Sequence, residues 1–186
     1  TGLYWAWKHV RADYVGMVHY RRYFTHSNPY LIAKKRQRIF TGQDYEMLLK
    51  KTDIIVPDKR HYYIETTRSQ YEHAHHPNDL KVTAQIIQEK YPEYIPAFQK
   101  VMNRTWGHRF NMFVMKQEKI HLYCEWLFTI LFELEQRLDI SQYDLYNQRI
   151  FGFIAERLLD VWLETVQANY IEQSVCYMER QNWLLK

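Results

Sequence analysis

The chain has 186 residues, a length typical of one domain with a sizeable core. Its apolar content of 47% and charged content of 25% are ordinary for a globular protein, and its formal net charge of +4 at pH 7 is mild. Only two cysteines are present, Cys124 and Cys176, which excludes a disulfide framework and favours buried free thiols in a reducing compartment. No run approaches the roughly 20 apolar residues of a membrane-spanning helix, so we expect none.

The first half of the chain alternates helical and strand patterns. The aromatic-rich segment 3–10 predicts a short amphipathic helix, and segment 15–20 predicts a short apolar strand. A helix is expected over residues 45–51, followed by a buried strand at 53–57. Residues 34–38 form the densest basic run, which is either a solvated loop or helix face or a patch for nucleic acid or an anionic membrane.

The second half is dominated by helical periodicity. Segment 58–77 is polar, aromatic and rich in histidine, which predicts a long functional loop. A third strand is expected at 110–115, and the tail 171–185 forms either an extended arm or a last strand. The helical patterns cover residues 82–90, 94–104, 120–138 and 149–166. Strands separated by helices predict an α/β domain, and the chain shows only three or four strands.

The first predicted strand ends in His19, Tyr20, Arg21 and Arg22. Buried parallel strands often carry ligand groups where they emerge at their carboxyl ends. Two arginines there offer planar charged forks suited to phosphate or carboxylate, and strand alternation puts His19 and Arg21 on one face. The alternative is that the arginines pair with carboxylates or stack on neighbouring rings, and that His19 is a core histidine. The residues alone leave both readings open.

Two further groups of residues carry potential chemistry. His73, His75 and His76 fall in the predicted loop, where they can contact a substrate or, with nearby carboxylates, a divalent metal. Their spacing matches no metal motif, so substrate contact is the better interpretation. Glu156 follows Gly152 near the start of a predicted helix among apolar residues, a setting that suits either a general base or a carboxylate paired with a basic residue.

Nucleophilic triads and dinucleotide sites have no support in the sequence. It contains no Gly-x-Ser-x-Gly turn, and with only 5 glycines it shows no glycine-rich phosphate loop. Zinc-finger spacings and RNA-recognition signatures are also absent, so we expect no nucleic-acid partner.

Six blocks of sequence carry a family resemblance. They are residues 1–8, 14–24, 53–57, 111–115, 123–128 and 149–158, and the most specific is the His-Tyr-Arg-Arg-Tyr-Phe run at 19–24. In this order they resemble the DUF4422 family of bacterial glycosyltransferases over nearly the whole chain. Members of that family occur in capsule, exopolysaccharide and lipopolysaccharide gene clusters, and some resemble galactofuranosyltransferases that use UDP-galactofuranose.

The resemblance implies a GT-A-like α/β fold, a Rossmann-type nucleotide-sugar transferase domain over residues 1–186. The chain begins at Thr1 rather than Met, so the first strands of such a fold are expected to precede it. The implied enzyme is a hexosyltransferase that moves a hexosyl group, galactofuranosyl among the candidates, from a UDP-sugar to a growing surface polysaccharide. The alternative is a non-catalytic sugar- or anion-binding module of a polysaccharide assembly complex.

The resemblance also implies roles for individual residues. In metal-dependent GT-A enzymes an Asp-x-Asp motif holds a divalent ion, whereas here His19, Arg21 and Arg22 are expected to bind the donor diphosphate without a metal or other cofactor. Glu156 is expected to be the base of an inverting transfer. The residues expected to line the acceptor site are Tyr71, His75, His76, Asn111 and Met112. The expected location is cytoplasmic, with peripheral contact at the inner face of the membrane through the basic run, where lipid-linked acceptors lie.

Overall fold

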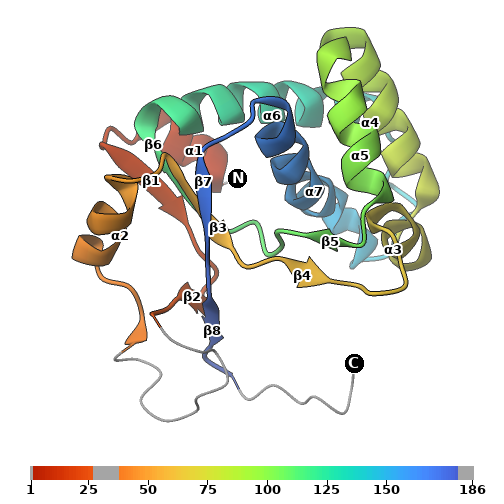
Figure 1. The fold of residues 1–186 in the computed structure, drawn as a ribbon. Helices are drawn as coiled ribbons and strands as arrows, with labels where there is room; N and C mark the ends of the chain where they lie inside the picture. Colours follow the sequence, from red (N-terminus) through yellow and green to blue (C-terminus); the bar gives the residue numbers. More distant parts are fainter. Residues whose placement is uncertain (1, 27–37, 180–186) are drawn as a thin grey trace.

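The computed structural model describes residues 2–26 and 38–179, and its centre is a four-stranded sheet. The strands lie in the order β1-β6-β3-β7, with bounds Tyr14–Met17, Phe113–Lys116, Ile54–Pro57 and Tyr170–Gln173. β6 runs antiparallel to both β1 and β3, whereas β3 and β7 are parallel. The sheet is therefore mixed, and β1, β3 and β7 all run in one direction (Figure 1).

Apolar side chains cover both faces of this sheet. In β3, Ile54 and Val56 belong to the larger core, and Ile55 between them belongs to a smaller core with Phe24 and Leu49. This alternation follows from the two-residue period of a strand, and it explains why the whole of β3 is apolar and buried. Figure 1 shows α2 on one side of the sheet and α6 and α7 on the other.

Seven helices surround the sheet within the described residues. Their bounds are Gly2–His9 (α1), Gly42–Leu49 (α2), Thr67–Ala74 (α3), Pro77–Lys90 (α4), Ile95–Asn103 (α5), Gln117–Arg137 (α6) and Ile150–Thr165 (α7). Short 3₁₀ helices lie at Pro92–Tyr94 and Asn147–Arg149. The six helices expected from periodicity are confirmed to within a few residues at most ends, and α3 was not expected.

Two small sheets complete the described chain. β2 (Arg22–Phe24) pairs with β8 (Val175–Tyr177), and β4 (Arg60–His61) pairs with β5 (Trp106–Gly107). The prediction of one long loop over residues 58–77 is wrong, because β4 and α3 lie within it. The tail contributes β7 and β8, which confirms the last-strand alternative as far as residue 179. Residues 34–37 of the basic run lie outside the described residues.

Two predicted strands are shorter than expected, and both shortened ends lie at the site described below. β1 ends at Met17 instead of continuing to residue 20. β6 begins at Phe113, because Phe110 and Asn111 have positive φ angles of 79° and 52°, which a strand does not accommodate.

Candidate functional site

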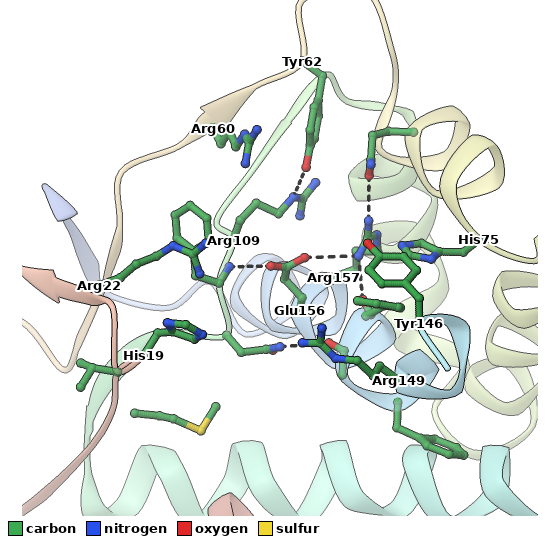
Figure 2. Close-up of a pocket in the computed structure, with 18 residues that line it drawn as sticks. His19, Arg22, Arg60, Tyr62, His75, Arg109, Tyr146, Arg149, Glu156 and Arg157 are labelled. Atoms are coloured by element: carbon green, nitrogen blue, oxygen red, sulfur yellow. Dashed lines mark hydrogen bonds and ion pairs between the residues drawn. The ribbon is translucent and has the colours of Figure 1, made fainter. Parts of the chain in front are cut away.

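A cavity of about 680 Å³ opens beyond the end of β1, between β4, α3 and the start of α7 (Figure 2). Its titratable lining is strongly cationic, with five arginines and two histidines against a single carboxylate. These residues are Arg22, Arg60, Arg109, Arg149, Arg157, His19, His75 and Glu156. Such an excess of positive charge in a concave site favours an anionic ligand.

Three of the five guanidinium groups have no carboxylate partner among the described residues: those of Arg22, Arg60 and Arg149. Arg22 is oriented by aromatic rings, with Cζ 4.3 Å from the centroid of Phe110 and 5.5 Å from that of Tyr177. Its buried Nε has no hydrogen-bond partner within the described part of the chain. Because burying an unsatisfied charged donor is costly, a preoriented, unpaired Arg22 favours a bound anion at this position.

A tight turn places His19 and Arg22 in the cavity and Arg21 outside it. The backbone N–H of Arg22 donates to the carbonyl oxygen of His19 at 3.0 Å, so the strand pattern stops before these residues. Arg21 pairs with Glu179, with 3.0 Å between Nε and Oε1, and its Cζ lies 4.6 Å from the Tyr20 ring centroid. The prediction that His19 and Arg21 share one face is therefore wrong, because alternation does not apply within a turn.

The pKa of His19 reflects this cationic setting. Burial lowers it below the ordinary value, and the nearby charges of Arg22, Arg21 and Arg149 lower it further. Glu179 acts in the opposite direction but does not outweigh these effects. Because its pKa is lowered, the imidazole is neutral at pH 7, and an anion bound beside it would raise that pKa.

Glu156 supplies the only carboxylate in the cavity lining of the described chain, from the second turn of α7. Its Oε1 accepts a hydrogen bond from the backbone N–H of Phe110 at 2.5 Å, and its Oε2 lies 3.3 Å from Nη1 of Arg157. The side chain remains 20% exposed. Figure 2 shows it near the centre, with His19 and Arg22 on one side and Arg157 and Arg149 on the other. The carboxylate is thus held in place and still reachable from the cavity.

The backbone opposite Glu156 is strained. Phe110 and Asn111 are consecutive non-glycine residues in the left-handed region, each costing roughly 1 to 3 kcal/mol unless the surroundings compensate. Two contacts with α7 hold them: Phe110 donates to Glu156, and Nδ2 of Asn111 donates to the carbonyl oxygen of Gly152 at 3.0 Å. The strained turn therefore depends on the helix that carries the carboxylate.

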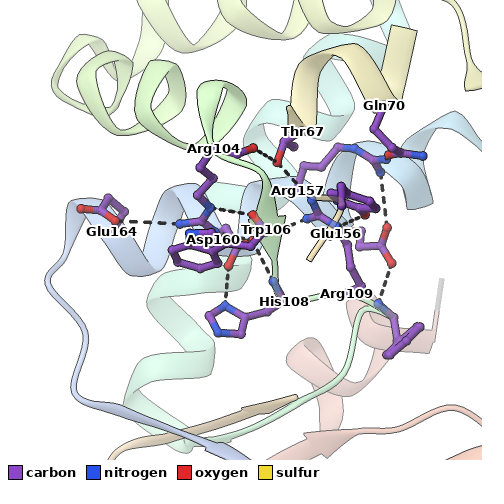
Figure 3. Close-up of polar contacts among 12 residues, drawn as sticks. Thr67, Gln70, Arg104, Trp106, His108, Arg109, Glu156, Arg157, Asp160 and Glu164 are labelled. Atoms are coloured by element: carbon purple, nitrogen blue, oxygen red, sulfur yellow. Dashed lines mark hydrogen bonds and ion pairs between the residues drawn. The ribbon is translucent and has the colours of Figure 1, made fainter. Parts of the chain in front are cut away.

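Below the cavity, Asp160 organises a buried network one helical turn after Glu156 (Figure 3). Oδ2 of Asp160 accepts a hydrogen bond from the backbone N–H of His108 at 3.0 Å. Oδ1 of Asp160 lies 2.6 Å from Nδ1 of the same histidine. Arg104 approaches it to 2.6 Å and Arg109 to 3.5 Å. Burial by itself raises the pKa of Asp160, but the His108 hydrogen bond and the two arginine charges outweigh burial and lower it.

This network holds Arg109 at the cavity wall. Besides Asp160, Arg109 donates to the Tyr62 hydroxyl at 2.6 Å and to that of Thr67 at 3.2 Å. Arg157 is held similarly, since it donates to the carbonyl oxygen of Phe153 at 2.8 Å and to Gln70 at 2.7 Å. These two arginines are held by several protein groups and form part of the cavity wall, although Nη1 of Arg109 and Nε of Arg157 are buried without a hydrogen-bond partner in the described part of the chain.

The structure brings together only part of the acceptor residues expected from the resemblance. His75 and Asn111 line the cavity. Tyr71 is fully buried and donates to Asp79 at 2.8 Å, and Met112 is fully buried in the smaller core. His76 stacks on Tyr143, 3.9 Å between centroids, outside the cavity lining.

Sequence reasoning did not assign Arg60, Arg109, Arg149 and Arg157 to the site, because they come from three separate parts of the chain and no local motif marks them. The only available signals were that Arg109 stands beside a predicted strand and that Arg149 and Arg157 lie within the block 149–158.

The described ranges, 2–26 and 38–179, contain no group of three His, Cys, Asp or Glu side chains arranged to bind a metal ion. The histidines considered for such a site have other contacts: His73 lies 2.6 Å from Glu65, and Nδ1 of His75 lies 3.0 Å from Oδ1 of Asn147. In the same part of the chain, no helix is long and apolar enough to cross a bilayer.

Comparison with known proteins gives one structural match and one family match. The chain is similar to the apo structure of WbbM, a bifunctional glycosyltransferase, with a TM-score of 0.88 and 28% identity. The match covers 97% of this chain but only 36% of WbbM, so the chain spans about a third of that protein. This likeness confirms the expected glycosyltransferase-like α/β fold. No curated protein matches the sequence. The model of DUF4422, a domain of unknown function, matches residues 1–168, and the chain therefore belongs to the DUF4422 family.

Proposed function

We propose that this chain carries the catalytic site of a glycosyltransferase that moves a hexosyl group from a UDP-sugar to a growing bacterial surface polysaccharide. One observation supports this most: a single reachable carboxylate, Glu156, shares a cavity with three guanidinium groups that have no carboxylate partner in the described chain. A nucleotide-sugar transferase needs both charges, because a base must activate the acceptor and cations must stabilise the departing diphosphate.

The donor diphosphate is assigned to Arg22 and Arg149, with His19 as a hydrogen-bonding partner. Guanidinium groups bind phosphate oxygens through two parallel hydrogen bonds and keep their charge at any physiological pH. The leaving nucleoside diphosphate gains negative charge as its bond to the sugar breaks, so preoriented arginines lower the barrier in the role that a divalent metal serves elsewhere. Arg21 is left out of this assignment because it lies outside the cavity.

The transfer step is assigned to Glu156. Its carboxylate accepts the proton of the acceptor hydroxyl while that oxygen attacks the anomeric carbon in line. The bond between the anomeric carbon and the diphosphate oxygen breaks with its electron pair leaving on UDP, and the product has inverted configuration. His75 and Asn111 are placed to contact the acceptor sugar. Galactofuranose is the first donor group to test, and a lipid-linked glycan is the proposed acceptor.

The test measures UDP release by the full-length protein from a panel of UDP-sugars, UDP-galactofuranose included, with and without EDTA. Glu156→Gln retains an oxygen that accepts from the Phe110 N–H but cannot take a proton, so we expect kcat to fall by about 10² to 10⁴. Arg22→Met keeps much of the packing and removes the charge, so we expect a lower kcat together with a higher KM for the donor. Arg21→Met, on the neighbouring residue outside the cavity, should have a smaller effect.

Each proposed element has an outcome that contradicts it. Normal turnover by Glu156→Gln would contradict the role of Glu156 as the general base. Activity that EDTA abolishes and Mn²⁺ restores would remove the metal-independent mechanism. If UDP-sugars bind without turnover on any acceptor tested, the chain is instead a sugar- or anion-binding module, the alternative that the sequence left open.

A further inference from the structure

The most exposed large apolar side chains of the described residues lie on loops that also contribute to the cavity lining. They are Ile64 at 93% exposure, Tyr63 at 88%, Leu145 at 85% and Tyr20 at 67%. In each of the three loops that carry them, a neighbouring residue lines the cavity: His19, Tyr62 and Tyr146. Figure 2 shows these three lining residues on different sides of the cavity. The exposed side chains therefore form an apolar rim, defined here as Tyr20, Tyr63, Ile64 and Leu145.

The Tyr63–Ile64 tip is held in an unfavourable backbone conformation. Tyr63 has φ = 62°, and the N–H of Ile64 donates to the carbonyl oxygen of Tyr62 at 2.7 Å, which closes a strained three-residue γ-turn. The turn is fixed on both sides, by the Tyr62 hydroxyl bonded to Arg109 and by Glu65 paired with His73. Strain of this kind persists only where the surroundings enforce it, and here it presents two apolar side chains to solvent.

The second tip is fixed by a carboxylate. Oδ1 of Asp144 accepts hydrogen bonds from the backbone N–H groups of Tyr146 at 2.8 Å and Asn147 at 2.9 Å. Leu145 stands between these anchored positions and points to solvent. Two separate loops thus display aliphatic side chains beside the same cavity.

The charges near the rim complement an anionic surface. Arg60 lines the cavity, has no carboxylate partner among the residues described, and is not assigned to the donor diphosphate. Two carboxylates lie beside the tips, Asp144 with its backbone donors and Glu65 with His73, and the five arginines of the cavity lining outnumber them. Apolar tips beside an opening with an excess of positive charge are the composition of a surface that inserts at the boundary between lipid headgroups and acyl chains.

We propose that the apolar rim docks on an anionic lipid bilayer, with Tyr63, Ile64 and Leu145 inserted among the headgroups and the cavity facing the membrane. A glycan platform fits less well, because sugars stack on aromatic faces, whereas Ile64 and Leu145 are aliphatic. A protein groove also fits less well, because the side chains stand on separate loops around an opening. This inference goes beyond the proposed function, since docking does not require turnover.

The experiment is sedimentation of the full-length protein with vesicles of phosphatidylglycerol and phosphatidylethanolamine, compared with vesicles of phosphatidylcholine alone. We expect binding to the anionic vesicles, and a loss of about tenfold or more in the triple variant Tyr63→Ser, Ile64→Ser, Leu145→Ser. The matched control is Met47→Ser with Leu122→Ser, which removes exposed apolar side chains (59% and 53%) from α2 and α6, away from the cavity. This control should bind as the wild type does.

Three results would overturn the proposal. The first is no binding of the wild type to anionic vesicles. The second is binding that survives the triple substitution, which would assign the contact to another surface such as the basic run 34–38. The third is a triple variant that fails to turn over or bind a water-soluble acceptor at the wild-type level, which would assign the rim to the glycan. Vesicle binding is read without turnover, so a failure of the proposed enzyme function leaves this test intact.

Discussion

The described cavity lining contains two histidines, His19 and His75, and His19 is the one beside Arg22 in the proposed diphosphate site. Burial and three arginines lower its pKa below the ordinary value, so it is neutral at pH 7. A bound diphosphate reverses the local charge and raises that pKa, so donor binding takes up a proton. We expect the affinity for UDP-sugar to increase as the pH falls from about 8 to 6.

Calorimetric titration of the donor across this pH range, in buffers of different ionisation enthalpy, measures both the affinity and the proton uptake. His19→Asn keeps a hydrogen-bonding group but cannot titrate, so it should lose the pH dependence. An unchanged pH dependence in His19→Asn would show that another group takes up the proton.

At the same scale, the sequence predicted the cavity only in part. The resemblance identified His19, Arg22, His75, Asn111 and Glu156, which the structure does bring together. It did not predict that Arg21 turns away, because that depends on a four-residue turn and on Glu179 at the far end of the chain. Contacts between residues more than 150 positions apart leave no local pattern to read.

At the scale of elements, Gly107 at the end of β5 is required by the position of Arg109. A Cβ at residue 107 would overlap the Arg109 guanidinium, which is buried and held by Tyr62, Thr67 and Asp160. Gly107→Ala must displace this side chain, and we expect it to lower the free energy of unfolding by about 1 to 3 kcal/mol.

Urea denaturation measures this effect. Gly42→Ala in the first turn of α2 is the matched control, because its Cβ would have no neighbour within 4 Å and alanine favours the helix. Equal stability of the two variants would mean that Arg109 relocates without cost.

The elements themselves were predictable where periodicity is strong and unpredictable where it is weak. The core-facing residues of α6 and α7 recur at helical spacing over 21 and 16 residues, and both helices were expected. By contrast α3 has only eight residues, mostly polar, with Thr67 and Tyr71 buried, so nothing in its pattern distinguished it from a loop. The Phe110–Asn111 turn was missed because its conformation is imposed by α7 and not by its own residues.

For the whole molecule, Asp160 couples stability to pH. Its pKa in the folded state is below the unfolded value near 3.8, so it stabilises the fold above about pH 4. That contribution is lost as the pH falls through the folded pKa. Asp160→Asn leaves buried cations without their counter-charge, and we expect a loss of about 3 to 5 kcal/mol at pH 7.

Urea unfolding of both proteins at several pH values tests this coupling. The stability difference between wild type and Asp160→Asn should begin to narrow below about pH 4, where Asp160 of the unfolded protein takes up a proton, and should narrow until the pH has fallen through the lower folded pKa. Glu164→Gln, on the more exposed edge of the same network, should change little. A difference that stays constant at all pH values would contradict the assigned role of the Asp160 charge.

The position of β7 has a consequence for any shortened form of the chain. The family match ends at residue 168, yet β7 begins at Tyr170 and pairs with β3 along its whole length. A protein trimmed to the matched segment would turn β3, the most apolar strand of the sheet, into an open edge with unpaired backbone groups. Such an edge is a template for pairing with another molecule. By covering β3, strand β7 therefore protects the protein from aggregation.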